Sequence, residues 1–145
     1  MIEGVLQVVI DTNVLVATLR SRRGASFHLL QTLGSARWQP NFSTALIFEY
    51  EEVLRREALR IGLPFEICDA IVDRICALGR ESDIFFRWRT HLPDPDDDFL
   101  LELAVACGAD LLITHNVRDL APAAEFGIRV MTPGEFLRTI KAEAV

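Results

Sequence analysis

The sequence predicts an α/β protein, a three-layer α/β/α sandwich with a mainly parallel central sheet. The run from Val5 to Ile10 is almost entirely apolar and rich in β-branched residues, and residues 111–114 form a second such run. Runs of this kind are typical of strands that helices cover on both faces. Helical patterns alternate with them, which favours parallel strands joined by helices. At 145 residues, we expect one domain over residues 1–145.

The first half of the chain contains four predicted helices and one short strand. Apolar residues recur at helical spacing over residues 13–19, 25–33, 44–59 and 65–78. Ser43 or Thr44 is expected to cap the third helix, because either hydroxyl can accept a hydrogen bond from its first turn. Trp38 and its neighbours predict the strand, which Pro40 is expected to close.

The second half contains three predicted strands and two helices. The strands are expected at residues 84–86, 111–114 and 127–131, the last at an edge of the sheet. A helix opened by Asp94 is expected to end near Cys107 and Gly108. The last helix begins at Pro133, since proline is favoured at the first helical position.

Composition argues against several classes of protein. No apolar run is long enough to span a bilayer, and the segment Met1–Gly4 lacks the basic region of a signal peptide. We therefore expect a cytoplasmic protein with no membrane partner. The net charge of −6 argues against gripping nucleic acid by bulk positive charge, and the three cysteines form no Cys/His cluster for zinc.

Asp11 directly follows the first predicted strand, and Thr12 and Asn13 come next. In open α/β sheets, ligands bind beyond the carboxyl ends of the strands, which would place Asp11 at a binding crevice. Aspartate is also a preferred N-cap, so Asp11 could instead only cap the following helix. From this stretch alone, the two interpretations have equal weight.

Glu49 is the acid among residues 49–52 that leans toward the protein body. It borders the apolar stripe that includes Tyr50 and Val53, whereas Glu51 and Glu52 point away. Burying an unpaired charge is costly, which makes a function for Glu49 as reasonable as an ordinary solvated helix face.

Asp98 differs from the other acids of residues 94–98. Those acids have structural explanations, because they cap the predicted helix or favour its positive end. Asp98 and Glu102 instead form the polar side of a helix that is otherwise apolar almost all round. A carboxylate there is expected where a buried helix meets something polar.

A third polar cluster follows the second buried strand. It again places Thr, Asn and Asp after a strand, here Thr114, Asn116 and Asp119. His115 has no His or Cys partner at ligand spacing, so it is interpreted as a loop histidine rather than a metal ligand.

Four acids from separate elements are candidates for one catalytic site: Asp11, Glu49, Asp98 and Asp119. An oxygen-rich site selects Mg²⁺ or Mn²⁺ rather than zinc, and two such ions can promote cleavage of a phosphodiester. The polar side chains expected to support the site are Thr12, Asn13, Ser43 and Thr114. Carboxylates held close together repel one another, so at least one should have a raised pKa.

Five short motifs, in this order and spacing, resemble those of PIN-domain proteins. They are residues 10–15 (IDTNVL), 49–54 (EYEEVL), 94–100 (DPDDDFL), 109–114 (ADLLIT) and 132–137 (TPGEFL). The resemblance extends over nearly the whole chain. It is closest in kind to VapC-like ribonucleases, the toxin components of bacterial toxin–antitoxin pairs.

The resemblance implies a parallel-sheet fold and a nuclease that cleaves single-stranded RNA with Mg²⁺ or Mn²⁺. The family's acidic metal ligands map onto Asp11, Glu49 and Asp98, and a fourth position falls at Asn116 or Asp119. Asn116 is uncharged where many relatives carry Asp, which would weaken the hold on a second metal. Toxin members pair with a small antitoxin and often form homodimers, so the resemblance implies both partners.

Two other functions are consistent with parts of the sequence. A non-catalytic RNA-binding or scaffold PIN domain would have lost an acid, and only Asn116 hints at that. A phosphohydrolase with a nucleophilic aspartate usually needs a second carboxylate two residues later and a lysine. Here Asn13 stands at that position and Lys141 is the only lysine, which argues against this chemistry.

Three arginines follow the first predicted helix: Arg20, Arg22 and Arg23. They are candidates for contacts with RNA phosphates, because arginine is a common phosphate ligand. A solvated loop accounts for them equally well.

Overall fold

A five-stranded, all-parallel sheet forms the centre of the computed structural model, in the order β3-β2-β1-β4-β5. The structure describes residues 4–82 and 95–143, and for residues 95–98 and 142–143 it describes the backbone alone. The strands are β1 Leu6–Ile10, β2 Trp38–Phe42, β3 Arg80–Glu81, β4 Leu111–Ile113 and β5 Arg129–Met131.

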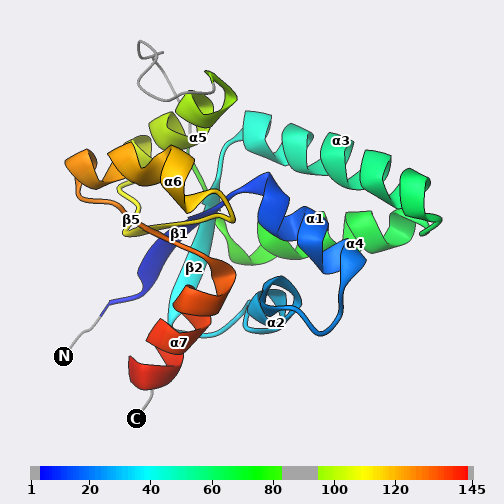
Figure 1. Cartoon of the computed structure of the whole chain (residues 1–145), viewed down its shortest axis with the longest axis horizontal. Coiled ribbons are helices and arrows are strands. Elements are labelled where there is room, and N and C mark those ends of the chain that lie inside the picture. The colour runs from blue at the N-terminus through cyan, green and yellow to red at the C-terminus, as the bar shows by residue number, and fades with distance from the viewer. Residues whose placement is uncertain (1–3, 83–94, 144–145) are drawn as a thin grey trace.

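Helices cover both faces of the sheet and make three layers (Figure 1). They are α1 Thr12–Arg20, α2 Ala25–Gln31, α3 Thr44–Ile61, α4 Phe65–Leu78, α5 Pro95–Ala106, α6 Val117–Leu120, the 3₁₀ helix η1 Ala121–Phe126 and α7 Pro133–Glu143. The helices α5 and α6 lie on one face, and α1, α2, α4 and α7 lie on the other, with α3 packed against α1 and α4. This is the predicted α/β/α sandwich.

The two central strands are as buried as their apolar sequences predict. Residues 8–10 of β1 and all of β4 are buried, and β1 pairs with β4 in the register Val8↔Leu111 to Ile10↔Ile113. A strand that is buried on both faces has apolar residues at successive positions, whereas a half-exposed strand alternates polar and apolar residues. The core therefore lies on both sides of β1 and β4, and the carboxyl ends of these strands meet at one edge.

Most elements agree with the predicted ones, and α4 has the predicted bounds. The prediction that Pro40 closes β2 was wrong, because the strand continues to Phe42. Pro40 pairs with Val8 of β1, while β3 reaches only Asn41 and Phe42, so the ladder tolerates a missing N–H at Pro40. The sequence patterns also missed β3, α6 and η1. The predicted strand at residues 84–86 and the predicted cap Asp94 lie outside the described residues.

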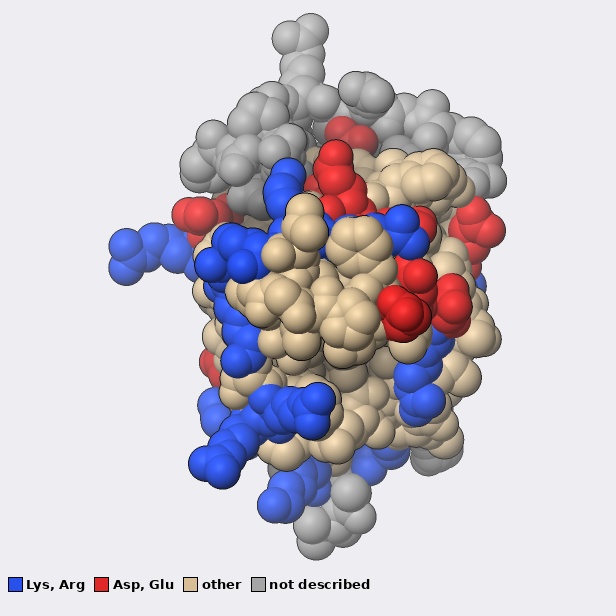
Figure 2. Space-filling model, turned by 90° about the vertical axis from the view of Figure 1, so that its right-hand side faces the viewer, with Lys and Arg blue, Asp and Glu red and all other residues tan. Residues whose placement is uncertain are grey.

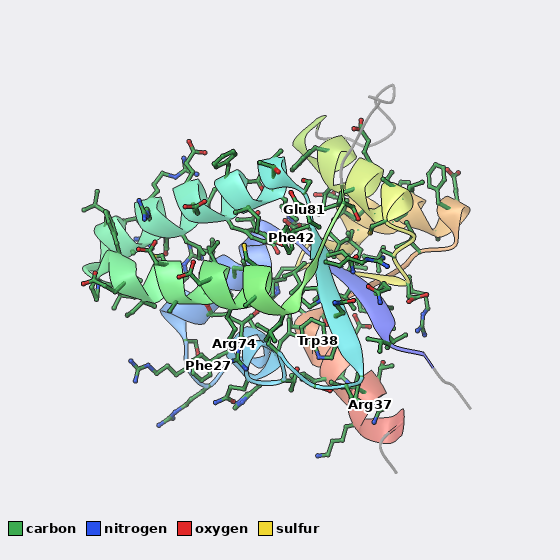
Figure 3. All side chains as sticks on the ribbon, turned by 180° about the vertical axis from the view of Figure 1, so that it is seen from behind. Phe27, Arg37, Trp38, Phe42, Arg74 and Glu81 are labelled. Carbon is green, nitrogen blue, oxygen red and sulfur yellow. The ribbon has the colours of Figure 1, made fainter. Side chains whose placement is uncertain are left out.

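Two side-chain contacts, made by residues that Figure 3 labels, join the elements around β2. Trp38 packs edge-on against Phe136 of α7, with ring centroids 5.4 Å apart. Arg74 of α4 donates a 2.8 Å hydrogen bond to the carbonyl oxygen of Leu33, after α2. The first contact therefore joins α7 to β2, and the second joins α4 to the residues that follow α2.

The turn between α3 and α4 projects from the body of the molecule (Figure 1). Figure 2 shows this end, where basic and acidic side chains border a largely uncharged surface. Exposed apolar side chains near the turn include Leu59, Ile61 and Phe65. None of the helices that the structure describes is long and apolar enough to cross a membrane.

Candidate active site at the ends of β1 and β4

The topology opens a crevice where β1 and β4 end. The chain leaves β1 toward β2 on one side, whereas it leaves β4 toward β5 on the other. Such a change of direction separates the connecting segments and makes the usual ligand site of open α/β sheets. Asp11 follows β1 and Thr114 follows β4, so both lie at this point.

Asp11 occupies the N-cap position of α1, but its side chain makes no capping hydrogen bond. Its Oδ2 atom instead accepts a 2.7 Å hydrogen bond from the Thr114 hydroxyl. Burial raises the pKa of Asp11, and the hydrogen bond from Thr114 opposes that rise. A raised pKa was expected from repulsion between carboxylates, whereas the main cause here is desolvation. Asp11 therefore stands at the N-cap position of α1 and also presents its carboxylate to the polar groups at the end of β4.

Glu49 is held next to the end of β1 by two contacts. The Thr12 hydroxyl donates a hydrogen bond to the Glu49 carboxylate. The neighbouring Tyr50 is fully buried and donates a 2.5 Å hydrogen bond to the carbonyl oxygen of Ile10, the last residue of β1. Burial raises the pKa of Tyr50, and the negative charges of Asp11 and Glu49 raise it further.

Thr114 is the centre of a small polar network. Its hydroxyl oxygen accepts hydrogen bonds from the Asn116 backbone N–H at 2.9 Å and the Asn13 side-chain amide at 3.4 Å. The Asn13 side-chain oxygen in turn accepts from the His115 backbone N–H at 3.3 Å. With these acceptor positions filled, the hydroxyl proton of Thr114 points at Asp11, which orients that carboxylate.

A pocket of about 470 Å³ opens beside these groups. It is lined by Thr12, Asn13, Val16, Ala17, Arg20, Val53, His115 and Asn116. Its volume lies in the range of ordinary ligand sites. One wall comes from α1, another from α3 and the third from the loop after β4, so the pocket lies between the elements that carry Asp11, Glu49 and Thr114.

The structure brings five predicted residues together: Asp11, Thr12, Asn13, Glu49 and Thr114. Ser43, also predicted to support the site, is buried and caps α3 by accepting a 3.1 Å hydrogen bond from the Leu46 N–H.

The fourth acidic position remains a prediction with two candidates. Asn116 lines the pocket, whereas Asp119 lies exposed on α6 and is not among the described lining residues. Asp98 is the fourth residue of α5, and its side chain lies outside the part that the structure describes.

The three candidate RNA-binding arginines separate in the structure. Arg20 lines the pocket, Arg22 lines a different, apolar cavity, and Arg23 is exposed. Glu57 was not among the predicted site residues; it is a buried acid that accepts a hydrogen bond from Arg20 at 2.6 Å. The sequence contains a pattern that could have identified Glu57, because it follows Glu49 by about two turns on the same side of α3.

The donors around Asp11 and Glu49 fit a hard divalent cation. Asp11 and Glu49 each carry a carboxylate that a threonine hydroxyl orients. The nearby Asn13 adds an amide oxygen, and hard cations prefer such oxygen ligands to sulfur. Among the described side chains, no group of three or more His, Cys, Asp or Glu residues gathers at metal-binding distance. Asp11 and Glu49 are therefore two candidate ligands, and Asp98 is the candidate for a third.

Comparison with known proteins identifies the family of the chain. No curated protein matches the chain. A family model described as the PIN domain matches residues 7–118, which is most of the chain and includes β1, α3, α5 and β4. The chain therefore belongs to the PIN-domain family and has its nuclease-type fold.

Proposed function

We propose that this protein is an endoribonuclease that cleaves single-stranded RNA and depends on Mg²⁺ or Mn²⁺. The observation that carries the proposal is the desolvated Asp11 carboxylate at the change of direction in the sheet, with Glu49 held beside it by Thr12. Membership of a family with a nuclease-type fold supports the same chemistry.

Each residue of the site has a defined part in this proposal. Asp11, Glu49 and Asp98 would hold the cation, with Asn116 or Asp119 at a fourth position. When bound, the cation supplies the positive charge that makes a water nucleophilic and stabilises the leaving oxygen of a phosphodiester. Thr114 and Thr12 keep the first two carboxylates oriented, and the pocket beside them admits the RNA strand.

The test is cleavage of a single-stranded RNA oligonucleotide by purified protein with Mg²⁺ or Mn²⁺. We expect cleavage with either ion, loss of cleavage in EDTA, and loss in Asp11→Asn. Equal cleavage in EDTA would contradict the metal mechanism. An intact wild type that binds RNA but cuts none would favour a non-catalytic RNA-binding domain, the function to which an uncharged Asn116 points.

The proposal extends to the biological role of a toxin that pairs with a small antitoxin and forms a homodimer. Its support is the resemblance of five motifs to toxin members of the family. Expression of the wild type should arrest bacterial growth, whereas expression of Asp11→Asn should not. Light scattering on the purified protein measures the mass of the particle, and a monomer at all concentrations would contradict the homodimer.

A further inference from the structure

Two polar side-chain pairs join the helices α1 and α3, one at the candidate metal site and one farther along both helices. The Thr12 side chain donates to Glu49 and the Arg20 side chain donates to Glu57, and each pair is 37 residues apart in sequence. The equal offset means that the two helices run side by side in the same direction (Figure 1). Val16 and Val53 line the pocket between the two polar pairs.

The surroundings of the two side-chain pairs carry net charges of opposite sign. Thr12 and Arg20 are two turns apart on α1, a separation of about 12 Å along the helix axis. The carboxylates of Asp11 and Glu49 lie at the first pair. At the second pair, Glu57 accepts hydrogen bonds from Arg20 and Arg60, so two guanidinium groups surround one carboxylate.

Glu57 is buried, with 9% of its side chain exposed, whereas the Arg20 side chain is 58% exposed. The contact with Arg60 uses both oxygens of Glu57, at 3.0 and 2.7 Å. Both oxygens of this carboxylate therefore accept hydrogen bonds from guanidinium groups. It is placed to anchor Arg20 at the rim of the pocket.

Arg20 keeps donors available for a ligand. Of the described residues, only Glu57 accepts a hydrogen bond from the Arg20 side chain, and it does so from Nε. A guanidinium has five N–H groups, so its two outer nitrogens can still bind a second anion. Because Glu57 already restrains the side chain, less conformational entropy is lost when that anion binds.

We infer that Arg20 binds a phosphate that flanks the cleaved one on a single-stranded RNA, and that Glu57 is the positioning residue that holds Arg20 there. This inference rests on the proposed nuclease function and adds a substrate requirement to it. The substrate must continue from the metal site along α1 and α3. A lone phosphodiester without flanking nucleotides would not reach Arg20.

The alternative is an ion pair that only joins two helices. Loss of such a pair would lower stability and would impair the cleavage of every substrate alike. Loss of a phosphate contact would impair only substrates long enough to reach it. Two substrates of different length therefore separate the two roles.

The experiment compares bis(p-nitrophenyl) phosphate with a single-stranded RNA oligonucleotide, both in Mn²⁺. The variants are Arg20→Ala, Arg20→Lys and Glu57→Gln. Arg55→Ala is the matched control, because Arg55 also pairs with a carboxylate, Asp69, and its loss changes the charge equally. We expect Arg20→Ala to raise KM for RNA about tenfold, as for one charged hydrogen bond, and to leave the small diester within about twofold.

The other variants refine this expectation. Arg20→Lys should recover part of the RNA affinity, and Glu57→Gln should raise KM for RNA less than Arg20→Ala does. Arg55→Ala should match the wild type on both substrates. An unchanged KM for RNA in Arg20→Ala, or equal losses on both substrates, would overturn the inference.

RNA binding in Ca²⁺, followed by fluorescence anisotropy, keeps the inference testable even if the wild type cleaves neither substrate and the proposed function fails. Arg20→Ala should then bind RNA more weakly, with a salt dependence reduced by about 0.7 in the logarithmic slope. Affinity and slope equal to those of the wild type would overturn the inference, as would a wild type that binds no RNA.

Discussion

Thr114, directly after β4, is bonded to the ends of both neighbouring strands, because its hydroxyl donates to Asp11 after β1 and its backbone N–H donates to Met131 of β5. Replacing Thr114 with Val keeps the shape of the side chain and removes the hydrogen bond. We expect kcat/KM for RNA to fall about 10- to 100-fold, as for other residues that orient a metal ligand. Thr114→Ser keeps the hydroxyl and should lose much less. Equal activity of the Val and Ser variants would show that this hydrogen bond does not matter.

The acids of the site should differ from their neighbours when each is neutralised. Asp11→Asn and Glu49→Gln should each lower kcat about 100-fold or more, since each removes a charge that acts on the reaction. Glu52→Gln, on the exposed side of α3, should remain active.

In α5, we propose that Asp98→Asn is inactive and Asp96→Asn active. The measurement is single-turnover cleavage of RNA by each purified variant. Similar rates for these two variants would show that the wrong acid of the run was chosen.

The junction between α4 and β3 depends on a glycine. A Cβ atom at Gly79 would lie 2.7 Å from the carbonyl oxygens of Ile75 and Pro40 and 2.9 Å from the Phe42 ring. Gly79→Ala should therefore lower the free energy of unfolding by about 1–3 kcal/mol, measured by urea denaturation. Gly4→Ala is the control, because a Cβ there meets no atom within 4 Å. Equal stability of the two variants would contradict this account of the junction.

The packing of α1 against α3 should depend on pH through Glu57. Hydrogen bonds from Arg60 and Arg20 lower the pKa of Glu57 from its usual 4.5 to about 2. A folded-state pKa below the unfolded one stabilises the protein above about pH 4.5, and this stability is lost as the pH falls toward 2.

The matching variant is Glu57→Gln, and the measurement is the melting temperature as a function of pH. The wild type should melt above the variant at pH 7, and the two curves should converge as the pH falls through the range from 4.5 to 2. A constant difference across that range would show that the charge of Glu57 does not stabilise the fold.

Elements whose signal lies in local apolar spacing could be predicted from the sequence. The helices α3 and α4 carry continuous apolar stripes, β4 is an apolar run, and β1 is apolar except for Gln7. β3 could not be predicted, because two polar residues, Arg80 and Glu81, form a strand only by pairing with Asn41 and Phe42. For a similar reason β2 continues beyond Pro40, because its pairing with β1 and β3 keeps the strand extended despite the proline.

At the level of the whole molecule, the position of Asp11 could be predicted because the carboxyl ends of parallel strands share one edge. The pairing of Arg20 with Glu57 could not, since it depends on how α1 and α3 lie against each other. No local pattern encodes that offset. Asn116 and Asp119 likewise lie only three residues apart in sequence, yet only Asn116 lines the pocket.

Metal binding should stabilise the whole fold, because a cation that binds only the folded state shifts the unfolding equilibrium. At a hundredfold excess over Kd, the gain is about 2.7 kcal/mol. For a domain of this size, that gain corresponds to a rise in Tm of about 5 to 10 °C. Asp11→Asn has lost a ligand and should gain much less. Without metal, it should melt no lower than the wild type, because its buried site no longer holds that charge.

A melting series against Mn²⁺ tests most directly whether Asp11, Glu49 and Asp98 hold a cation. The proteins are the wild type, Asp11→Asn, Glu49→Gln and Asp98→Asn, with Glu52→Gln as the control outside the site. We predict that Mn²⁺ raises the Tm of the wild type and of Glu52→Gln equally, and raises that of the other three much less. No shift in the wild type, or a full shift in Asp11→Asn, would contradict a metal site at the ends of β1 and β4.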